Sequence, residues 1–429
     1  MRRTPLLMAA LLGVALAVPA DALQPDAGAA AVPAARAATS SATTSSAATS
    51  SAASDLGARV NTALSAAGAP TIAAAVEVDG LGTVLRRDAA HQLPPASTQK
   101  SFVSGAALLR LGPATRFRTE VASLSAPVDG VVQGDLWLVP GGDPYLTTSG
   151  LRALAKALRA AGVTRVTGVL RLDDSRYDAK RRAAGWETEW VPEESGPLSS
   201  FAVDANRWRT DSAFLSDPAM PNAVKARDLM RAEGIHIGTI TRQRRPASAT
   251  TLASVQSGPL SAVVRRLLKD SDNFAAELVL KEVGRVVTGR GTSVDGLAAV
   301  RSVLGQLGVK VGVGSDGSGL STDDRQNPDS QVALLRVLDA SEVSAAFRTA
   351  LPVACRDGTL KERMCGTAAE GRASAKTGTV TGVRCLAGYT TTRSGRVVRF
   401  AFQITGVQDG TRARNAMDRA VAVLAAATE

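Results

Sequence analysis

The sequence predicts an α+β fold with one antiparallel five-stranded sheet that is covered by helices, plus an inserted β-rich domain. Two observations lead to this expectation. Strand-like patterns lie near both ends of the main body of the chain, and helical patterns lie between them. The stretch at residues 113–254 differs in character, with short β-type pieces, one clear helix and many turn residues. We therefore expect residues 55–112 and 255–429 to form one domain around an inserted domain at residues 113–254.

The first 54 residues are expected to lie outside this fold. Met1 and two arginines precede an apolar run from Leu6 to Val18 and a small-residue site at Ala20-Asp21-Ala22, which is typical of a cleaved secretory signal. A membrane anchor is the alternative, but the run is shorter than a span requires. We predict a signal peptide at residues 1–22, no transmembrane span after its cleavage, and export to the periplasm or cell-wall space. Residues 23–54 are mostly Ala, Ser, Thr and Pro and are predicted to form a disordered linker.

The N-terminal part of the main domain contributes two of the five strands. An amphipathic pattern predicts a helix at residues 55–67, and two strand patterns at 71–78 and 83–87 are joined by a turn through Asp79-Gly80. Helical spacing resumes at residues 97–111 and stops at a glycine, so Ser97 is expected at a helix N-terminus.

The C-terminal part contributes helices and the other three strands. The expected helices lie at residues 260–269, 274–284, 294–307 and 412–426, and the expected strands near 373–377, 383–391 and 396–404. Within the insert the clearest elements are a strand at 134–139 and a helix at 151–161.

Composition narrows the chemistry that this chain can perform. Net charge is +11, but only nine of the fifty basic residues are lysine and no basic run is interleaved with aromatic residues, so we do not expect a nucleic-acid partner. Attraction to anionic wall polymers and a simply solvated arginine-rich surface both explain the charge. His91 and His236 are the only histidines, which leaves little for a Ser-His-Asp site or a histidine-rich zinc site. We expect neither a metal nor another cofactor.

Three cysteines lie late in the chain, at Cys355, Cys365 and Cys385. In an exported protein this number permits one disulfide and leaves one thiol. We predict a Cys355–Cys365 bridge, because the two residues bracket a short polar segment that contains glycine. A set of reduced, buried cysteines is the alternative.

Ser97 and Lys100 form the first motif that carries chemistry. Residues three apart on a helix share a face, so the Lys100 amine is expected within reach of the Ser97 hydroxyl. A helix N-terminus, partial burial and a second cation all lower the pKa of a lysine, which allows the amine to act as a base. Lys100 is the only lysine with a serine three residues before it. A capped helix with a solvated lysine is the alternative.

Two further motifs follow. Ser271-Asp272-Asn273 lies at a break between predicted helices, where a hydroxyl can relay a proton and an amide can hold a peptide; the same three residues are also typical of a helix N-cap. Lys376-Thr377-Gly378-Thr379 ends a predicted strand, where a cation and two hydroxyls can bind a carboxylate and Gly378 permits close approach of a substrate backbone; a turn between strands is the alternative.

In this order, the three motifs match the set found in penicillin-recognising serine enzymes, and the wider context resembles the type-4 penicillin-binding proteins. That context consists of Gly134-Asp135-Leu136 leading to Gly141-Gly142-Asp143-Pro144, then Asp316-Gly317-Ser318-Gly319-Leu320-Ser321, then Asp357-Gly358-Thr359-Leu360. The resemblance extends over most of the chain from Asp55 onward and includes the large insert. It implies a penicillin-binding transpeptidase-like fold and a serine-type D-alanyl-D-alanine carboxypeptidase or endopeptidase.

The resemblance also implies a role for each motif residue. Ser97 would be the acylated nucleophile, Lys100 its base and Ser271 the proton relay, while Asn273 holds the substrate. The residues expected to meet the substrate carboxylate are Lys376, Thr377 and Thr379; the backbone N–H groups of Ser97 and Thr379 would form the oxyanion hole, and Asp143 would contact the peptide stem. The implied ligands are peptidoglycan stem peptides ending in D-Ala-D-Ala and β-lactam antibiotics.

Two rival readings remain. A serine β-lactamase shares the three motifs, but in its compact forms the second motif follows the first much more closely than Ser271 follows Ser97. A non-catalytic wall-binding protein on the same fold is the other, and the reactive side chains of all three motifs count against it.

Overall fold

The computed structural model describes residues 39–429, with side chains from Ser50 onward. The expected signal peptide at residues 1–22 and the first part of the expected linker lie outside the described residues. Within residues 39–429, no helix combines the length and the apolar character needed to cross a bilayer.

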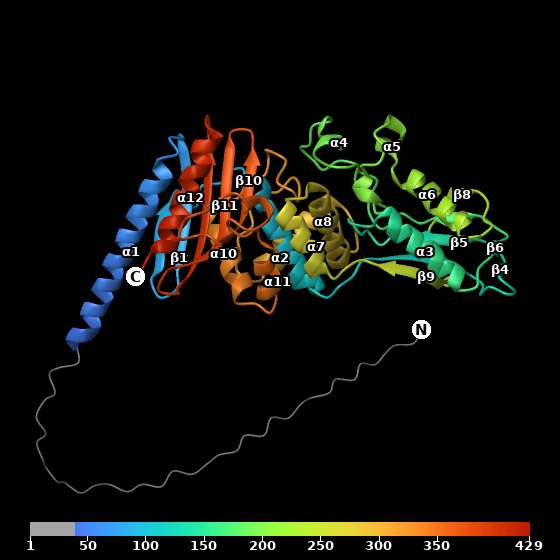
Figure 1. Cartoon of the computed structure of the whole chain (residues 1–429), viewed down its shortest axis with the longest axis horizontal. Coiled ribbons are helices and arrows are strands. Elements are labelled where there is room, and N and C mark those ends of the chain that lie inside the picture. Colours follow the sequence, from blue (N-terminus) through green and yellow to red (C-terminus); the bar gives the residue numbers. More distant parts are fainter. Residues whose placement is uncertain (1–38) are drawn as a thin grey trace, which may run out of the picture. The chain divides into compact units, whose positions relative to one another are not determined.

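The central feature is a five-stranded sheet with the strand order β10-β11-β12-β1-β2 (Figure 1). Its strands are β1 (Thr71–Val78), β2 (Gly82–Arg87), β10 (Ser374–Val380), β11 (Val383–Thr391) and β12 (Val397–Thr405). All four pairings are antiparallel, and β1 runs beside β12 from the pair Thr71–Thr405 to the pair Val78–Val398. The prediction of one antiparallel sheet assembled from both ends of the chain is confirmed.

Two helices share an apolar core with this sheet. Leu56 and Val60 of α1 (Thr39–Ser65) and Val421 of α12 (Gly410–Ala426) pack with buried strand residues such as Phe400. The helix α1 begins at Thr39, within the segment that composition assigned to a disordered linker. Alanine is the strongest helix former, which favours a helix in this segment, and Ala53 is already buried in the core two residues before the expected start at residue 55.

A second core lies among the helices that contain the first two motifs. Its helices are α2 (Gln99–Leu111), α7 (Leu260–Asp270), α8 (Asn273–Thr288), α9 (Ser293–Gly305), α10 (Pro328–Asp339) and α11 (Ser344–Ala350). In this group α2 contacts α7, α8 and α9, and α10 lies against β1, β11 and β12. The sheet and the helical cluster are therefore in direct contact.

The chain between α2 and α7 forms a second sheet, with the strand order β8-β7-β5-β3-β9. Its strands are β3 (Arg118–Ser123), β5 (Leu136–Val139), β7 (Leu170–Leu172), β8 (Ile240–Arg242) and β9 (Thr250–Gln256), and the helices α3 (Thr148–Ala160) and α6 (Ala219–Ala232) share its core. β7 pairs in parallel with β5 and β8, whereas β3 pairs antiparallel with β5 and β9. The sheet continues through β9 to Gln256, two residues beyond the expected end of the insert.

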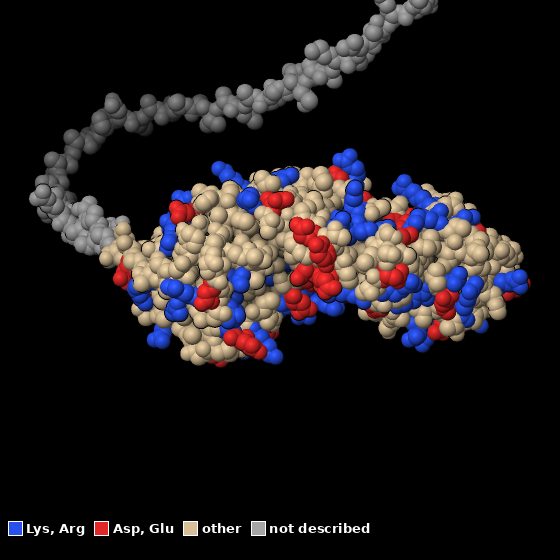
Figure 2. Space-filling view, turned by 90° about the horizontal axis from the view of Figure 1, so that it is seen from above, with Lys and Arg blue, Asp and Glu red and all other residues tan. Residues whose placement is uncertain are grey.

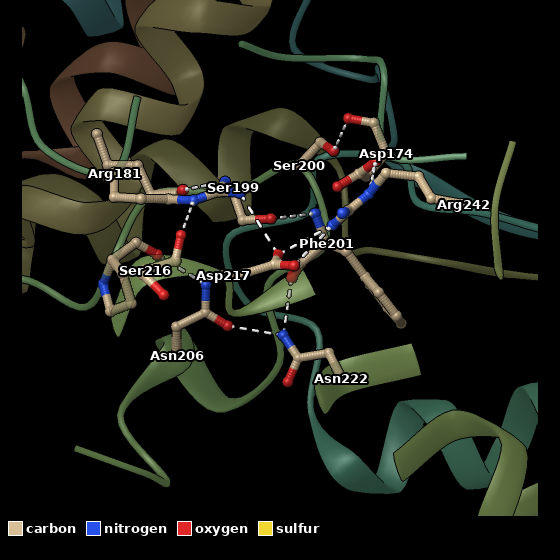
Figure 3. A network of polar contacts seen from close by, with 12 residues as sticks. Asp174, Arg181, Ser199, Ser200, Phe201, Asn206, Ser216, Asp217, Asn222 and Arg242 are labelled. Carbon is tan, nitrogen blue, oxygen red and sulfur yellow. Dashed lines mark hydrogen bonds and ion pairs between the residues drawn. The ribbon is translucent and has the colours of Figure 1, made fainter. Parts of the chain in front are cut away.

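Polar contacts fix a long segment of the insert between β7 and α6 (Figure 3). Arg242 donates to Asp174 Oδ1 at 2.9 Å and to Asp217 Oδ1 at 2.9 Å, so it joins the two ends of the segment. The buried Asn222 donates to Asn206 Oδ1 and to the carbonyl of Phe201, each at 2.8 Å. These bonds anchor the segment at residues 174–217, which continues to the Ser97 cavity described below.

The prediction of a Cys355–Cys365 disulfide is confirmed, and Cys385 is a free, buried thiol in β11.

The surplus of basic residues is dispersed: on the face shown in Figure 2, Lys and Arg side chains lie among acidic and uncharged ones. On this face, the described residues form no continuous stripe of basic side chains of the kind that follows a nucleic-acid backbone.

Candidate active site

Ser97 and Lys100 lie where the chain turns into α2. A short 3₁₀ turn at Ala96–Thr98 precedes α2, and Ala96 adopts a positive φ of 46°. Lys100 lies about one helical turn after Ser97, and the Lys100 Nζ donates to the Ser97 Oγ at 2.8 Å. The two residues of the first motif are therefore in direct contact.

The Lys100 amine has two other partners and no access to solvent. Its Nζ lies 2.7 Å from Asn273 Oδ1 and 2.6 Å from the carbonyl oxygen of Ser318. The side chain is fully buried, and burial lowers the pKa of Lys100 to about 8, although nearby carboxylates such as Asp316 act in the opposite direction. A neutral amine keeps two N–H donors for Asn273 and Ser318 and presents its lone pair to the Ser97 hydroxyl. The geometry therefore suits a general base.

The second motif occupies the joint between α7 and α8. Ser271 adopts a left-handed conformation with φ 56°, which ends α7. Asp272 then caps α8, and its side chain accepts a hydrogen bond from the N–H of Ala275 at 3.0 Å. Asn273 is the first residue of α8 and reaches Lys100. The motif is therefore both a helix cap and part of the site, because Asp272 caps the helix and lies between the two site residues Ser271 and Asn273.

Lys376 is arranged differently from the expectation. Its Nζ donates to Ser271 Oγ at 2.9 Å and to the carbonyl of Thr377 at 2.8 Å, and its side chain is fully buried. Burial, together with the nearby charge of Lys100, holds the pKa of Lys376 well below its usual value. Lys376 therefore contacts the second motif and does not line the Ser97 cavity, whereas the sequence led us to expect contact with a substrate carboxylate.

A cavity of about 550 Å³ opens beside these residues. Its lining includes Ser97, Ser271, Asn273, Thr377 and Thr379, so the structure brings the three motifs together at one surface. Ser97 and Thr379, the two residues expected to provide oxyanion-hole N–H groups, both border this cavity.

Gly378 lies where β10 passes the turn that precedes α2. A Cβ at this position would lie 2.8 Å from the carbonyl oxygen of Pro95 and 2.9 Å from the Cβ of Cys385. Glycine is therefore required for contact between the strand and the Ser97 turn, which is a different reason from the substrate approach expected from the sequence.

Sequence reasoning assigned no role to the loop that contacts Lys100. The carbonyl of Ser318 is held in place because buried carboxylates bind the N–H groups around it: Glu277 Oε1 accepts from Gly317 and Ser318 at 2.8 and 2.9 Å, and Asp316 Oδ1 accepts from Gly319 at 2.6 Å. Burial and the charge of Asp316 raise the pKa of Glu277 to about 8. The available signal was the glutamate within the apolar helix α8, which follows the second motif by four residues.

Asp143 is not part of this site. It follows β5, accepts a hydrogen bond from the N–H of Tyr145 at 2.9 Å, and lines a separate cavity with Tyr145 and Arg266. Burial raises the pKa of Asp143 to about 6. The carboxylate of Asp143 turns back onto its own loop and does not line the Ser97 cavity. Its contact with the peptide stem stays a prediction.

Other walls of the cavity come from segments that sequence reasoning did not single out. Trp190 and Glu194 belong to the insert segment that the polar network anchors, and the Asn273 side-chain amide donates to the carbonyl of Glu194 at 3.3 Å. Arg363 comes from the loop closed by the disulfide, and Arg414 from α12. No short motif marks these residues because they are separate in sequence.

Comparison with known proteins settles the family. The sequence pattern described as the D-Ala-D-Ala carboxypeptidase 3 (S13) family matches residues 58–232 and 215–427, which together are most of the chain. The chain belongs to this family. A D-alanyl-D-alanine carboxypeptidase of Actinomadura sp. (strain R39) is 31% identical over 386 residues, which cover 71% of this chain and 72% of the relative. The resemblance to type-4 penicillin-binding proteins is thereby confirmed.

Solved structures show the same fold as this S13 family chain. Penicillin-binding protein 4 from Haemophilus influenzae superposes with a TM-score of 0.75 at 21% identity, covering 84% of this chain and 98% of that one. The same protein complexed with a β-lactam gives a TM-score of 0.69 at 21% identity over the same shares of the two chains. At this level of identity the likeness concerns the fold alone.

Proposed function

We propose that this chain is a serine-type D-alanyl-D-alanine carboxypeptidase that acts on peptidoglycan stem peptides through an acyl-enzyme on Ser97. The observation that carries the proposal is the buried Lys100 amine, which lies 2.8 Å from the Ser97 hydroxyl and has a pKa lowered to about 8. An amine that is neutral part of the time and touches a serine at the edge of a cavity is the arrangement that activates a hydroxyl as a nucleophile. Membership in the S13 family supports the substrate class.

Acylation begins with removal of the Ser97 proton. The lone pair of neutral Lys100 takes this proton as the Oγ attacks the carbonyl carbon between the two D-alanines, forming the C–O bond of a tetrahedral intermediate. The negative charge that develops on the carbonyl oxygen would be met by the N–H groups of Ser97 and Thr379, which border the cavity. Asn273 holds Lys100 through its Oδ1 and stays at the cavity surface, where its amide can contact the peptide.

Collapse of the intermediate breaks the C–N bond and requires a proton on the departing nitrogen. The Ser271 hydroxyl lies at the cavity and accepts a hydrogen bond from Lys376 at 2.9 Å, so Ser271 can donate its own proton and regain one from the lysine pair. Free D-alanine leaves, and the acyl group remains on Ser97. Water then attacks the ester, the same base removes its proton, and the Ser97 hydroxyl is restored.

Labelling with penicillin tests the proposal. A β-lactam presents a strained amide and a carboxylate, so we expect the folded protein to form one covalent adduct, and peptide mapping should locate it at Ser97. The Ser97→Ala variant should form none, whereas Ser302→Ala, a matched change at an exposed serine on α9, should be labelled normally. An adduct at another residue, or none on folded wild-type protein, would overturn the assignment.

We also propose that the protein works outside the cytoplasm. The Cys355–Cys365 disulfide supports this, because such bonds persist in oxidising compartments. The signal-like pattern at residues 1–22 supports it independently. Sequencing the N-terminus of the protein secreted by its native host would test both, since export with cleavage predicts a mature chain that begins after Ala22.

A further inference from the structure

One cation at the Ser97 cavity has no partner of its own. Arg414 lies on α12 with an exposed side chain and lines the cavity together with Thr377 and Thr379. Within the part of the chain whose side chains are described, its guanidinium makes no ion pair and no hydrogen bond. An unpaired guanidinium in a concave site is available to an anionic ligand.

The two neighbouring arginines are already engaged. Arg363 donates to Asp418 Oδ1 from its Nη2 at 2.6 Å and from its Nε at 3.1 Å. Arg384 directs its Nη1 to the carbonyl of Val380 at 3.1 Å and to that of Val383 at 2.8 Å. Among these three described arginines, Arg414 is therefore the one that makes no hydrogen bond and no ion pair, so all of its donors are free for a ligand.

The lysine of the third motif cannot take this role directly. Lys376 is fully buried, does not line the cavity, and gives two of its donors to Ser271 and to the carbonyl of Thr377. Thr377 is also occupied, since its hydroxyl donates to Thr359 Oγ1 at 2.8 Å. Thr379 is exposed beside Arg414. A carboxylate that arrives at the end of β10 thus meets one hydroxyl and one free cation.

We propose that Arg414 binds the C-terminal carboxylate of the substrate and, with the Thr379 hydroxyl, is the main determinant of specificity for a free C-terminus. The proposal rests on the proposed function and deepens it. The planar guanidinium offers two parallel N–H donors, which match the two oxygens of a carboxylate. The buried Lys100 and Lys376 amines bind other groups, so recognition of the charge and the proton transfers fall to different side chains.

The expected effect is moderate because Arg414 is open to solvent. Water screens an exposed ion pair, so we expect Arg414→Gln to lower kcat/KM for a free carboxylate by no more than about fivefold. For a substrate without the carboxylate, the loss should stay within about twofold. Arg414→Lys keeps the positive charge but lacks the two parallel N–H donors, so its kcat/KM should lie between those of wild type and Arg414→Gln.

The experiment measures kcat/KM for a diacetylated L-Lys-D-Ala-D-Ala tripeptide and for its C-terminal amide, and acylation rates with benzylpenicillin and with its methyl ester. Benzylpenicillin and its methyl ester give acylation rates even where the peptide amide is cleaved slowly. Arg419→Gln is the matched control: it is an exposed arginine on the same helix that does not line the Ser97 cavity, and it should leave all four rates unchanged.

Selective loss on the two charged compounds supports the inference. Equal losses on charged and uncharged compounds, or no loss at all in Arg414→Gln, would overturn it. These outcomes are distinct from failure of the proposed function, in which wild-type protein would neither cleave the tripeptide nor react with penicillin.

Discussion

The buried Lys100 base makes the rate of acylation depend on pH in a specific direction. With a pKa of about 8, about one half of the Lys100 amines are neutral at pH 8 and about one hundredth at pH 6. Only the neutral form can take the Ser97 proton, so the second-order acylation rate should fall about fiftyfold between these two pH values. The direction is fixed by the burial of the amine, because an ordinary lysine would remain protonated over the whole range.

Stopped-flow measurement with a fluorescent penicillin between pH 5.5 and pH 9.5 would record this profile. Lys100→Met should abolish acylation at every pH, whereas Lys156→Met, at an exposed lysine on α3, should retain the wild-type profile. Glu277 also has a pKa raised to about 8, so Glu277→Gln is the necessary discriminator. It should keep the pH dependence and move it to lower pH, because a negative charge that favours protonated Lys100 is lost. A flat profile in wild type, or one that disappears in Glu277→Gln, would refute Lys100 as the base.

Three further predictions follow from contacts at and near the site. Lys376→Ala should lower acylation more than about a hundredfold for free and amidated peptides alike, because this lysine contacts Ser271 instead of the cavity; a loss confined to free carboxylates would contradict that placement. Replacing Cys355 and Cys365 together by alanine should reduce the free energy of unfolding by about 2 to 3 kcal/mol, measured by urea titration, since the closed loop is short. Gly378→Ala should weaken penicillin acylation, whereas Gly305→Ala on α9, where a Cβ meets open space, should not. Normal labelling of Gly378→Ala would show that the turn tolerates a Cβ.

The strands of the main sheet could be predicted from the sequence because they follow strong local patterns. The meeting of the three motifs was implied by the resemblance to penicillin-recognising serine enzymes, since no local pattern brings such distant segments together. The apolar runs of β11 and β12, which are buried along nearly their whole length, and the glycine-containing turns define the strands. The spacing of Ser97 and Lys100 defines a shared helix face. The start of α1 was missed because an alanine-rich segment reads as disordered by composition, although Ala53 packs into the core. Strand pairing carried the insert past residue 254, since β9 pairs with β3 as far as Gln256.

Much of the site chemistry could not be predicted, for reasons that are physical. The acceptor that Ser318 offers to Lys100 is a backbone carbonyl, which no side-chain motif encodes. Arg414 reaches the cavity from the last helix, so only the tertiary fold brings it beside Thr379. The sequence also does not show where a side chain points. Asp143 binds its own loop and Lys376 binds Ser271, although both residue types suit contact with a peptide.

Release of D-alanine tests the central claim most directly. A peptide ending in D-Ala-D-Ala is incubated with wild-type protein and with Ser97→Ala, and both the free D-alanine and the shortened peptide are quantified by mass spectrometry. If Ser97 is the nucleophile of a carboxypeptidase, wild-type protein releases one D-alanine for each peptide shortened, and Ser97→Ala releases none while remaining folded. Continued release by Ser97→Ala, or no release by folded wild-type protein, would contradict it.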